Sequence, residues 1–172
     1  QCRLKRGCAK LLLGIKKRRD SVLMRNKEPS SSLYKKILAS MPIGCVDLVI
    51  VSRGKFLLAK RANNPAREKW WLVGGRVKKG EYIHNVAVRK AKEEAGLHVA
   101  VGRMLGVRDT MFPTSAFGVP THTVNVVYFV RALSLKGLRK DFQSSELKWF
   151  SRINRTWPKY VKEMLALAGF RK

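Results

Sequence analysis

"WWLVGGRVKKGEYIHNVAVRKAKEEAGL", residues 70–97, is the stretch that decides the fold. Its apolar start predicts a short strand at residues 70–75 that is stopped by Gly74 and Gly75. Residues 82–95 carry the clearest helical period in the chain. The apolar face of that helix consists of Ile83, Val86, Ala87 and Ala91. Gly96 is expected to end the helix.

The same helix brings acidic side chains together in a chain that has 37 basic and only 11 acidic residues. Arg89 and Glu93 are four residues apart, and so are Lys90 and Glu94, so each pair shares a helix face. Glu81 ends the turn before the helix and can fold back over that face. Clustered carboxylates are oxygen ligands that suit Mg²⁺. The alternative is that these acids are ordinary surface residues. We expect Lys90 to be a solvated helix residue, with a contact to phosphate as the alternative.

The composition is that of a folded globular protein with a large excess of positive charge. Of 172 residues, 45% are hydrophobic, which allows a buried core and excludes a disordered chain. The net charge of +26 favours anionic partners: nucleic acid, a membrane surface or phosphorylated small molecules. The charge does not choose among these partners. No apolar run is long enough to cross a bilayer, and a membrane is not among the partners that we expect. Cys2, Cys8 and Cys45 lack metal-binding spacing, and we expect reduced thiols in a cytoplasmic protein.

The start of the chain differs from the rest. Residues 1–30 are strongly basic, begin without methionine and show little regular period. We interpret them as an N-terminal extension that is not native or is disordered, added by an extended reading frame or by cloning. The alternative is an arm that binds nucleic acid. Residues 31–172 are expected to form one domain.

Further strands and helices surround the central helix. They are a helix at 30–41, a hairpin made of 43–52 and 56–61, strands at 97–109, 122–133 and 147–151, and a helix at 158–170. Loops are expected at 62–69 and 111–121. Strands around one central helix, with helices at both ends, predict an α/β (α+β) fold. Its expected form is an α/β/α sandwich with a mixed β-sheet.

Seven positions within residues 75–97 match the spacing of a known family. They are Gly75, Glu81, Arg89, Glu93, Glu94, Gly96 and Leu97. On these residues the chain resembles the Nudix hydrolases, which depend on Mg²⁺ and cleave nucleoside diphosphates linked to another group. It departs from the family at Lys90, where a glutamate is usual, and at Ala91, where a larger aliphatic residue is usual. The resemblance implies a Nudix-type sandwich.

Outside this motif the chain resembles one branch of the family, the GDP-mannose mannosyl hydrolases. That branch also lacks the glutamate after the arginine. The stretch VDLVIVSRGKFLLAKRANNPAREKWWLVGGRVKKGE, residues 46–81, is similar to its first strands and turn. The stretch PTHTVNVVYFV, residues 120–130, is similar to its later strand, which begins with a catalytic histidine. The likeness covers residues 33–151.

The resemblance implies a role for each matching residue. Arg61 and Arg76 would bind the diphosphate and stabilise its charge during the reaction, and Asp47 would act near the sugar and base. His122 would be the general base. Mg²⁺, or Mn²⁺ in its place, would be bound by Glu94, by the backbone carbonyl of Gly74, and by Glu81 or Glu93. Phe112 stands where the branch has an active-site tyrosine.

These observations predict an Mg²⁺-dependent hydrolase of a nucleotide sugar of the GDP-mannose or GDP-glucose type. Water would attack the anomeric carbon and release a nucleoside diphosphate and a free sugar. One alternative is an ordinary Nudix pyrophosphohydrolase, in which water attacks phosphorus in a nucleoside diphosphate derivative. A second alternative, suggested by the net charge of +26, is a basic protein associated with nucleic acid. The resemblance also implies a homodimer.

Overall fold

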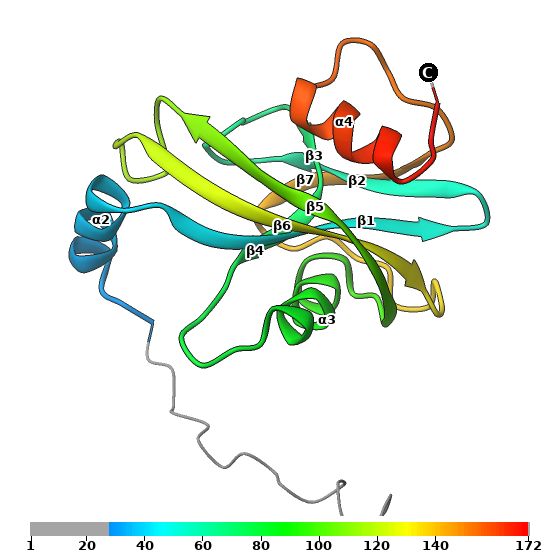
Figure 1. The fold of residues 1–172 in the computed structure, drawn as a ribbon, viewed down its shortest axis with the longest axis horizontal. Coiled ribbons are helices and arrows are strands. Elements are labelled where there is room, and N and C mark those ends of the chain that lie inside the picture. The colour runs from blue at the N-terminus through cyan, green and yellow to red at the C-terminus, as the bar shows by residue number, and fades with distance from the viewer. Residues whose placement is uncertain (1–27, 172) are drawn as a thin grey trace, which may run out of the picture.

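A curved β-sheet lies between helices in the computed structural model, which describes residues 28–171 (Figure 1). Helix α3 (Ile83–Ala95) covers one face of the sheet, and helix α4 (Lys159–Leu167) covers the opposite face. Helix α2 (Ser31–Ser40) lies at one end of the sheet. The predicted α/β/α sandwich is therefore confirmed.

The sheet has seven strands and is mixed, as predicted. Its strand order is β3-β2-β1-β6-β5, while β4 pairs with β1 and β7 pairs with β2. The pair formed by β1 and β6 is parallel, and the other pairs are antiparallel. The strands are β1 (Ile43–Ser52), β2 (Lys55–Arg61), β3 (Trp70–Trp71), β4 (Val73–Arg76), β5 (Val99–Phe112), β6 (Thr121–Ala132) and β7 (Ser144–Phe150).

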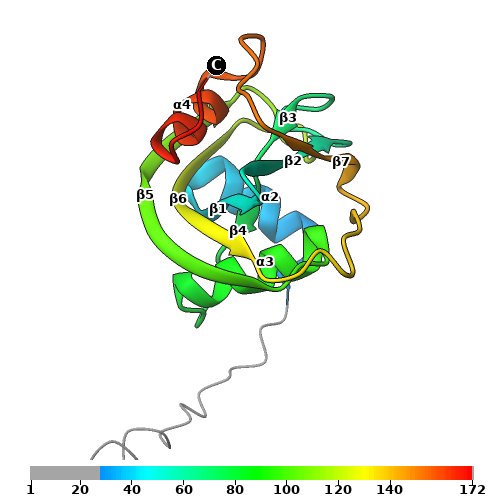
Figure 2. The same cartoon turned by 90° about the vertical axis from the view of Figure 1, so that its right-hand side faces the viewer.

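Strand β1 divides its pairing between two partners. Its first half pairs with β4, and its second half pairs with β2. Figure 2 shows β5 and β6 curving around β1 and β4. In the register of β1 with β4, Asp47 lies directly opposite Gly74 and Cys45 lies opposite Arg76. This register places the glycines of β4 beside the acid of β1.

Side chains of β1 alternate between two apolar cores. Val46, Leu48 and Ile50 belong to the core under α3, and Val49 belongs to the core under α4. None of these four side chains has exposed surface. The alternation is the period of a strand with both faces covered, so β1 is the middle layer of the fold.

The prediction that glycines stop the strand at residues 70–75 is wrong. Two strands form there, β3 and β4, and β4 continues through both glycines to Arg76. A Cβ atom at Gly74 would collide with the carboxylate of Asp47 and the carbonyl of Val46. Glycine at this position therefore lets two strands approach closely instead of ending one of them.

Helix α3 buries most of the face that its period predicted. Val86, Ala87 and Ala91 have no exposed surface, whereas Ile83 in the first turn is 41% exposed. The helix ends as predicted at Gly96, which adopts a left-handed φ of 69°.

The described residues begin inside the predicted N-terminal extension. The predictions for residues 1–27, with Cys2 and Cys8, lie outside the described residues. Ser30 caps α2 by accepting a hydrogen bond from the amide of Leu33. Cys45 is a buried free thiol, and burial raises its pKa to about 12, so it stays protonated at neutral pH. Among residues 28–171, no helix has both the length and the apolar character needed to span a membrane.

Gly96→Ala should destabilise the protein more than Gly54→Ala. Both glycines have a left-handed φ, 69° and 72°, so alanine costs roughly 1–2 kcal/mol at either position. At Gly96 the added Cβ would also collide with the carbonyl of Gly137, whereas nothing lies within 4 Å at Gly54. Urea titration should show a further loss of roughly 1–3 kcal/mol in the free energy of unfolding for Gly96→Ala. Equal losses in the two variants would contradict the close contact.

Candidate active site

A cavity of about 690 Å³ gathers most of the residues that the sequence singled out. Its lining includes Asp47 from β1, Arg61 from β2, Gly74 and Arg76 from β4, and Glu93 and Glu94 from α3. Lys78, Arg89 and Lys90 line the same cavity. Glu81 and His122 are not among its lining residues.

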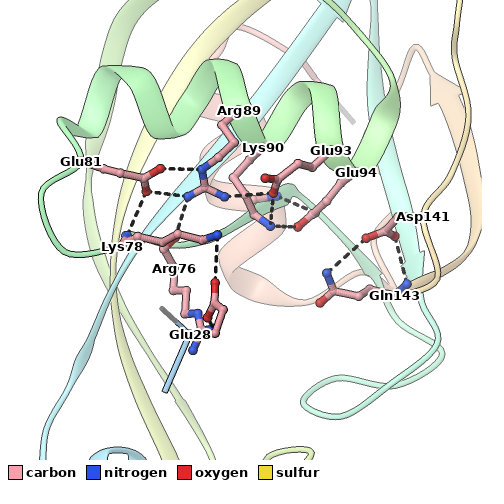
Figure 3. A network of polar contacts seen from close by, with 11 residues as sticks. Glu28, Arg76, Lys78, Glu81, Arg89, Lys90, Glu93, Glu94, Asp141 and Gln143 are labelled. Atoms are coloured by element: carbon pink, nitrogen blue, oxygen red, sulfur yellow. Dashed lines mark hydrogen bonds and ion pairs between the residues drawn. The ribbon is translucent and has the colours of Figure 1, made fainter. Parts of the chain in front are cut away.

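Arg89 organises the acidic cluster and joins α3 to the turn before it (Figure 3). It donates to both carboxylate oxygens of Glu81 at 2.7 Å, to Glu93 at 2.9 Å and to the carbonyl of Arg76 at 3.3 Å. Glu81 also accepts from the amide of Lys78 at 2.9 Å. Partial burial would raise the pKa of Glu81, but the hydrogen bonds from Arg89 and Lys78 outweigh it and the net pKa is lowered. The predicted fold-back of Glu81 over the helix is thus present.

Lys90 is buried, so the prediction that it is solvated is wrong. The residue is 8% exposed, and its Nζ lies 2.5 Å from Oε1 of Glu94 and 3.5 Å from Oε2 of Glu93. Glu94 also accepts a hydrogen bond from the amide of Gly74 at 3.2 Å. Burial raises the pKa of Glu94, and the Lys90 ammonium opposes that shift. The four-residue spacing between Lys90 and Glu94 is the same for a buried lysine as for a surface lysine, so the sequence did not distinguish the two.

In this structure the carboxylates of the predicted Mg²⁺ or Mn²⁺ site are paired with protein cations. In the part of the chain that the structure describes, no three His, Cys, Asp or Glu side chains are grouped to hold one ion. Glu81 is paired with Arg89, Glu94 is paired with Lys90, and Glu93 lies against both cations. All three carboxylates are therefore engaged by protein cations.

Asp47 is a buried acid with one strong partner. The hydroxyl of Tyr160 on α4 donates to Oδ2 of Asp47 at 2.6 Å. Burial raises the pKa of Asp47 to about 7, although the bond from Tyr160 and the charge of Arg61 act to lower it. Asp47 can therefore gain or lose a proton near neutral pH. Tyr160 was not among the site residues expected from the sequence.

Arg61 and Arg76 both line the cavity, as the resemblance implied. Arg61 donates from Nε to the carbonyl of Pro65 at 2.5 Å, which fixes its guanidinium. Burial lowers the pKa of Arg61, but a guanidinium stays charged in proteins. Arg76 lies over the ring of Tyr34, with Cζ 4.4 Å from the ring centroid, and pairs with the carboxylate of Glu28.

The structure does not bring His122 into the cavity. Its Nε2 lies 3.2 Å from Oδ1 of Asp109 on β5. Its neighbours Thr121 and Thr123 line the cavity, and successive side chains of a strand point to opposite faces. His122 therefore lies on the other face of β6 from the predicted substrate.

Aromatic side chains are among the residues that line the cavity. We call Trp71, Phe112 and Phe117 the aromatic wall. The rings of Trp71 and Phe112 have their centroids 5.5 Å apart, so the two rings pack together. Phe112 stands at the position where the resemblance implies a tyrosine.

Two lining residues were missed from the sequence. Asn125 is buried and donates to Thr110 at 3.1 Å and to the carbonyl of Arg108 at 3.2 Å. Gln143 precedes β7 and also lines the cavity. A polar residue within an apolar strand was the available signal for Asn125, and nothing in the local sequence marked Gln143.

Asp47→Asn should stabilise the protein at neutral pH. The folded-state pKa of about 7 lies above the ordinary value of 3.8, so the folded state binds the proton more tightly than the unfolded state. The wild-type free energy of unfolding should therefore fall as pH rises from about 4 to about 7 and then level off, and the variant should lack this fall. Urea titrations at pH 5 and pH 8 measure the gap, which should widen at pH 8.

Glu146→Gln is the matched control for this measurement, because Glu146 is an exposed acid on β7. Its free energy of unfolding should follow the wild type between the two pH values. A gap between Asp47→Asn and the wild type that does not change with pH would show that Asp47 ionises normally.

Comparison with known proteins identifies the family. The NUDIX domain matches residues 42–155. The chain is 36% identical over 118 residues to the low-salt glycan biosynthesis protein Agl8 of Haloferax volcanii, a match that covers 68% of this chain and 76% of Agl8. It is 44% identical over 66 residues to an ADP-ribose pyrophosphatase of Methanocaldococcus jannaschii, covering 38% of this chain and 39% of that protein.

A solved structure agrees with these matches. The MutT NUDIX hydrolase of Burkholderia pseudomallei superposes with a TM-score of 0.61 at 28% identity, covering 74% of this chain and 98% of the other. The residues that match the NUDIX domain include every strand from β1 to β7, together with α3 and its acidic network. The chain belongs to the NUDIX domain family.

Proposed function

We propose that the protein is a Nudix hydrolase whose substrate is a nucleoside diphosphate linked to a sugar. The observation that carries this proposal is that Arg61, Arg76 and Lys78 share one cavity with the aromatic wall. Guanidinium and ammonium groups bind phosphate oxygens, and aromatic rings bind the faces of bases and sugars. A ligand that carries both phosphate groups and a base or sugar would contact both the cations and the aromatic wall.

Arg61 and Arg76 are the residues that we assign to the diphosphate. Arg61 is held through its Nε, so its terminal nitrogens are available to phosphate oxygens. Arg76 contacts the carboxylate of Glu28, an anion whose place a phosphate can take. Both guanidinium groups would stabilise the negative charge that builds on the leaving phosphate.

Asp47 is suited to recognition of the base or the sugar. With a pKa of about 7, it can accept a hydrogen bond when ionised and donate one when protonated. Tyr160 orients its carboxyl group from α4. Asp47 would therefore select among ligands by their hydrogen-bonding groups, while the aromatic wall supplies affinity.

We propose that water attacks phosphorus. Attack at the anomeric carbon was predicted to use His122 as the base, and the imidazole of His122 pairs with Asp109 outside the cavity. Glu93 and Glu94 line the cavity, where either carboxylate can accept the proton of the attacking water. The products would be a nucleoside monophosphate and a sugar phosphate. We assign no step to Mg²⁺ or Mn²⁺, because Glu81, Glu93 and Glu94 are paired with protein cations.

The names of two relatives support a substrate that contains a sugar. One relative is an ADP-ribose pyrophosphatase, and ADP-ribose is a nucleoside diphosphate linked to a sugar. The other is named for glycan biosynthesis. Attack at the anomeric carbon, with release of free sugar, is the second candidate. It is favoured by the similarity of residues 46–81 to the GDP-mannose mannosyl hydrolases.

Hydrolysis in H₂¹⁸O separates the two reactions. ADP-ribose, GDP-mannose and UDP-glucose would each be incubated with the full chain, and the products analysed by mass spectrometry. We expect the label in a phosphate product, because attack at phosphorus forms a new phosphorus–oxygen bond. Label in the free sugar would establish attack at carbon. If none of the three compounds is cleaved, the proposed function is incorrect.

His122→Gln should retain most of the wild-type turnover, because the imidazole lies outside the cavity. A general base that is lost typically lowers the rate by about 10²–10⁴-fold. Steady-state kinetics on the best substrate measure the change. A loss in that range would show that His122 is the general base, as the resemblance implied.

Arg61→Gln should lower kcat/KM on the same substrate by roughly 10²–10³-fold, the usual effect of losing one charged group that stabilises the transition state. Arg53→Gln is the control, because Arg53 is exposed in the turn between β1 and β2. Its kcat/KM should be unchanged. Equal losses in both variants would indicate an effect of net charge and not of a diphosphate site.

A further inference from the structure

We propose that Lys90 is a resident cation of the active site. Its ammonium group takes the position between Glu93 and Glu94 that a divalent ion would otherwise occupy, and it binds a phosphate oxygen of the substrate. The second part of this inference rests on the proposed function, because it concerns the same cavity. The first part depends only on how Lys90 is placed.

The side chain of Lys90 is built into the fold between α3 and β4. A Cβ atom at Gly75 would lie 2.5 Å from Cε and 3.1 Å from Nζ of Lys90. Because residue 75 is a glycine, no side chain separates the ammonium from the β4 backbone. The Lys90 side chain lines the cavity and is 11% exposed. The cation is therefore held at the cavity wall.

The contacts of Lys90 leave it able to bind a ligand. Its Nζ lies 2.5 Å from Glu94 and 3.5 Å from Glu93 (Figure 3). An ammonium group has three N–H donors, so two carboxylate contacts leave one donor for a phosphate oxygen. Arg61 and Arg76 line the same cavity, so a diphosphate bound there would meet three cations.

The charge of the network argues against a tightly bound divalent ion. The three carboxylates of Glu81, Glu93 and Glu94 are paired with the two cations Arg89 and Lys90. Most of the negative charge that would attract a metal is thereby neutralised. A divalent ion beside Glu94 would also lie close to the Lys90 ammonium, and like charges at such distances repel strongly where burial lowers the dielectric constant.

Mn²⁺ binding to the full chain without substrate tests this inference independently of activity. Free Mn²⁺ would be measured by electron paramagnetic resonance for the wild type, Lys90→Glu and Lys90→Met. We expect Lys90→Glu to bind Mn²⁺ at least about 100-fold more tightly than the wild type, because it replaces a repelling charge with a ligand. Lys90→Met removes only the repulsion and should gain at least about 10-fold. This neutral variant keeps the test available if Lys90→Glu fails to fold.

Lys92→Glu is the matched control. Lys92 is exposed on the same helix, so its replacement changes the net charge by the same amount as Lys90→Glu. Its affinity for Mn²⁺ should equal that of the wild type. The inference is overturned if Lys92→Glu gains as much affinity as Lys90→Glu. It is also overturned if the wild type already binds Mn²⁺ as tightly as Lys90→Glu.

Activity provides the second readout. Wild-type hydrolysis of the best substrate should persist in EDTA, and Lys90→Met should raise KM at least about 10-fold under the same conditions. Loss of wild-type activity in EDTA with recovery on adding Mg²⁺ would overturn the resident-cation role. If no substrate is hydrolysed under any condition, the proposed function fails, and Mn²⁺ binding alone decides the placement of Lys90.

Discussion

The buried charge pair between Lys90 and Glu94 is the constraint on which the site depends. A charge removed from water is costly unless an opposite charge and hydrogen bonds accompany it. Here the two side chains satisfy each other, and the amide of Gly74 satisfies the second oxygen of Glu94. Gly75 leaves the space that the lysine fills. The position of α3 against β4 and the chemistry of the cavity wall are therefore parts of one arrangement.

The close approach of β4 to β1 connects this pair to the other side of the sheet. Gly74 lies opposite Asp47, where any larger residue would collide with the carboxylate. Asp47 in turn is held by Tyr160 from α4. The cavity thus draws charged groups from both covered faces of one sheet. The proposed substrate class rests on the cations and aromatic rings that line this one cavity.

Local features of the chain were predictable because they depend on neighbours in sequence. The helix at 83–95, its end at Gly96 and the pairing of Arg89 with Glu93 follow from periods and spacings of a few residues. The strands were found for the same reason, except that β3 and β4 appeared as one strand ended by glycine. Glycine commonly ends a strand, and Gly74 was interpreted in that way. Here Gly74 lies inside β4, because only glycine allows β4 to approach β1 so closely.

The sequence by itself determined the order of elements, the sandwich and the family motif, since each follows from the period and spacing of residues along the chain. Only the tertiary structure decided that Lys90 is buried, that His122 lies outside the cavity and that Tyr160 orients Asp47. The physical reason is that pairing and burial depend on residues distant along the chain. Asp47 and Tyr160, for example, are 113 positions apart, and no local pattern in the sequence predicts that their side chains meet.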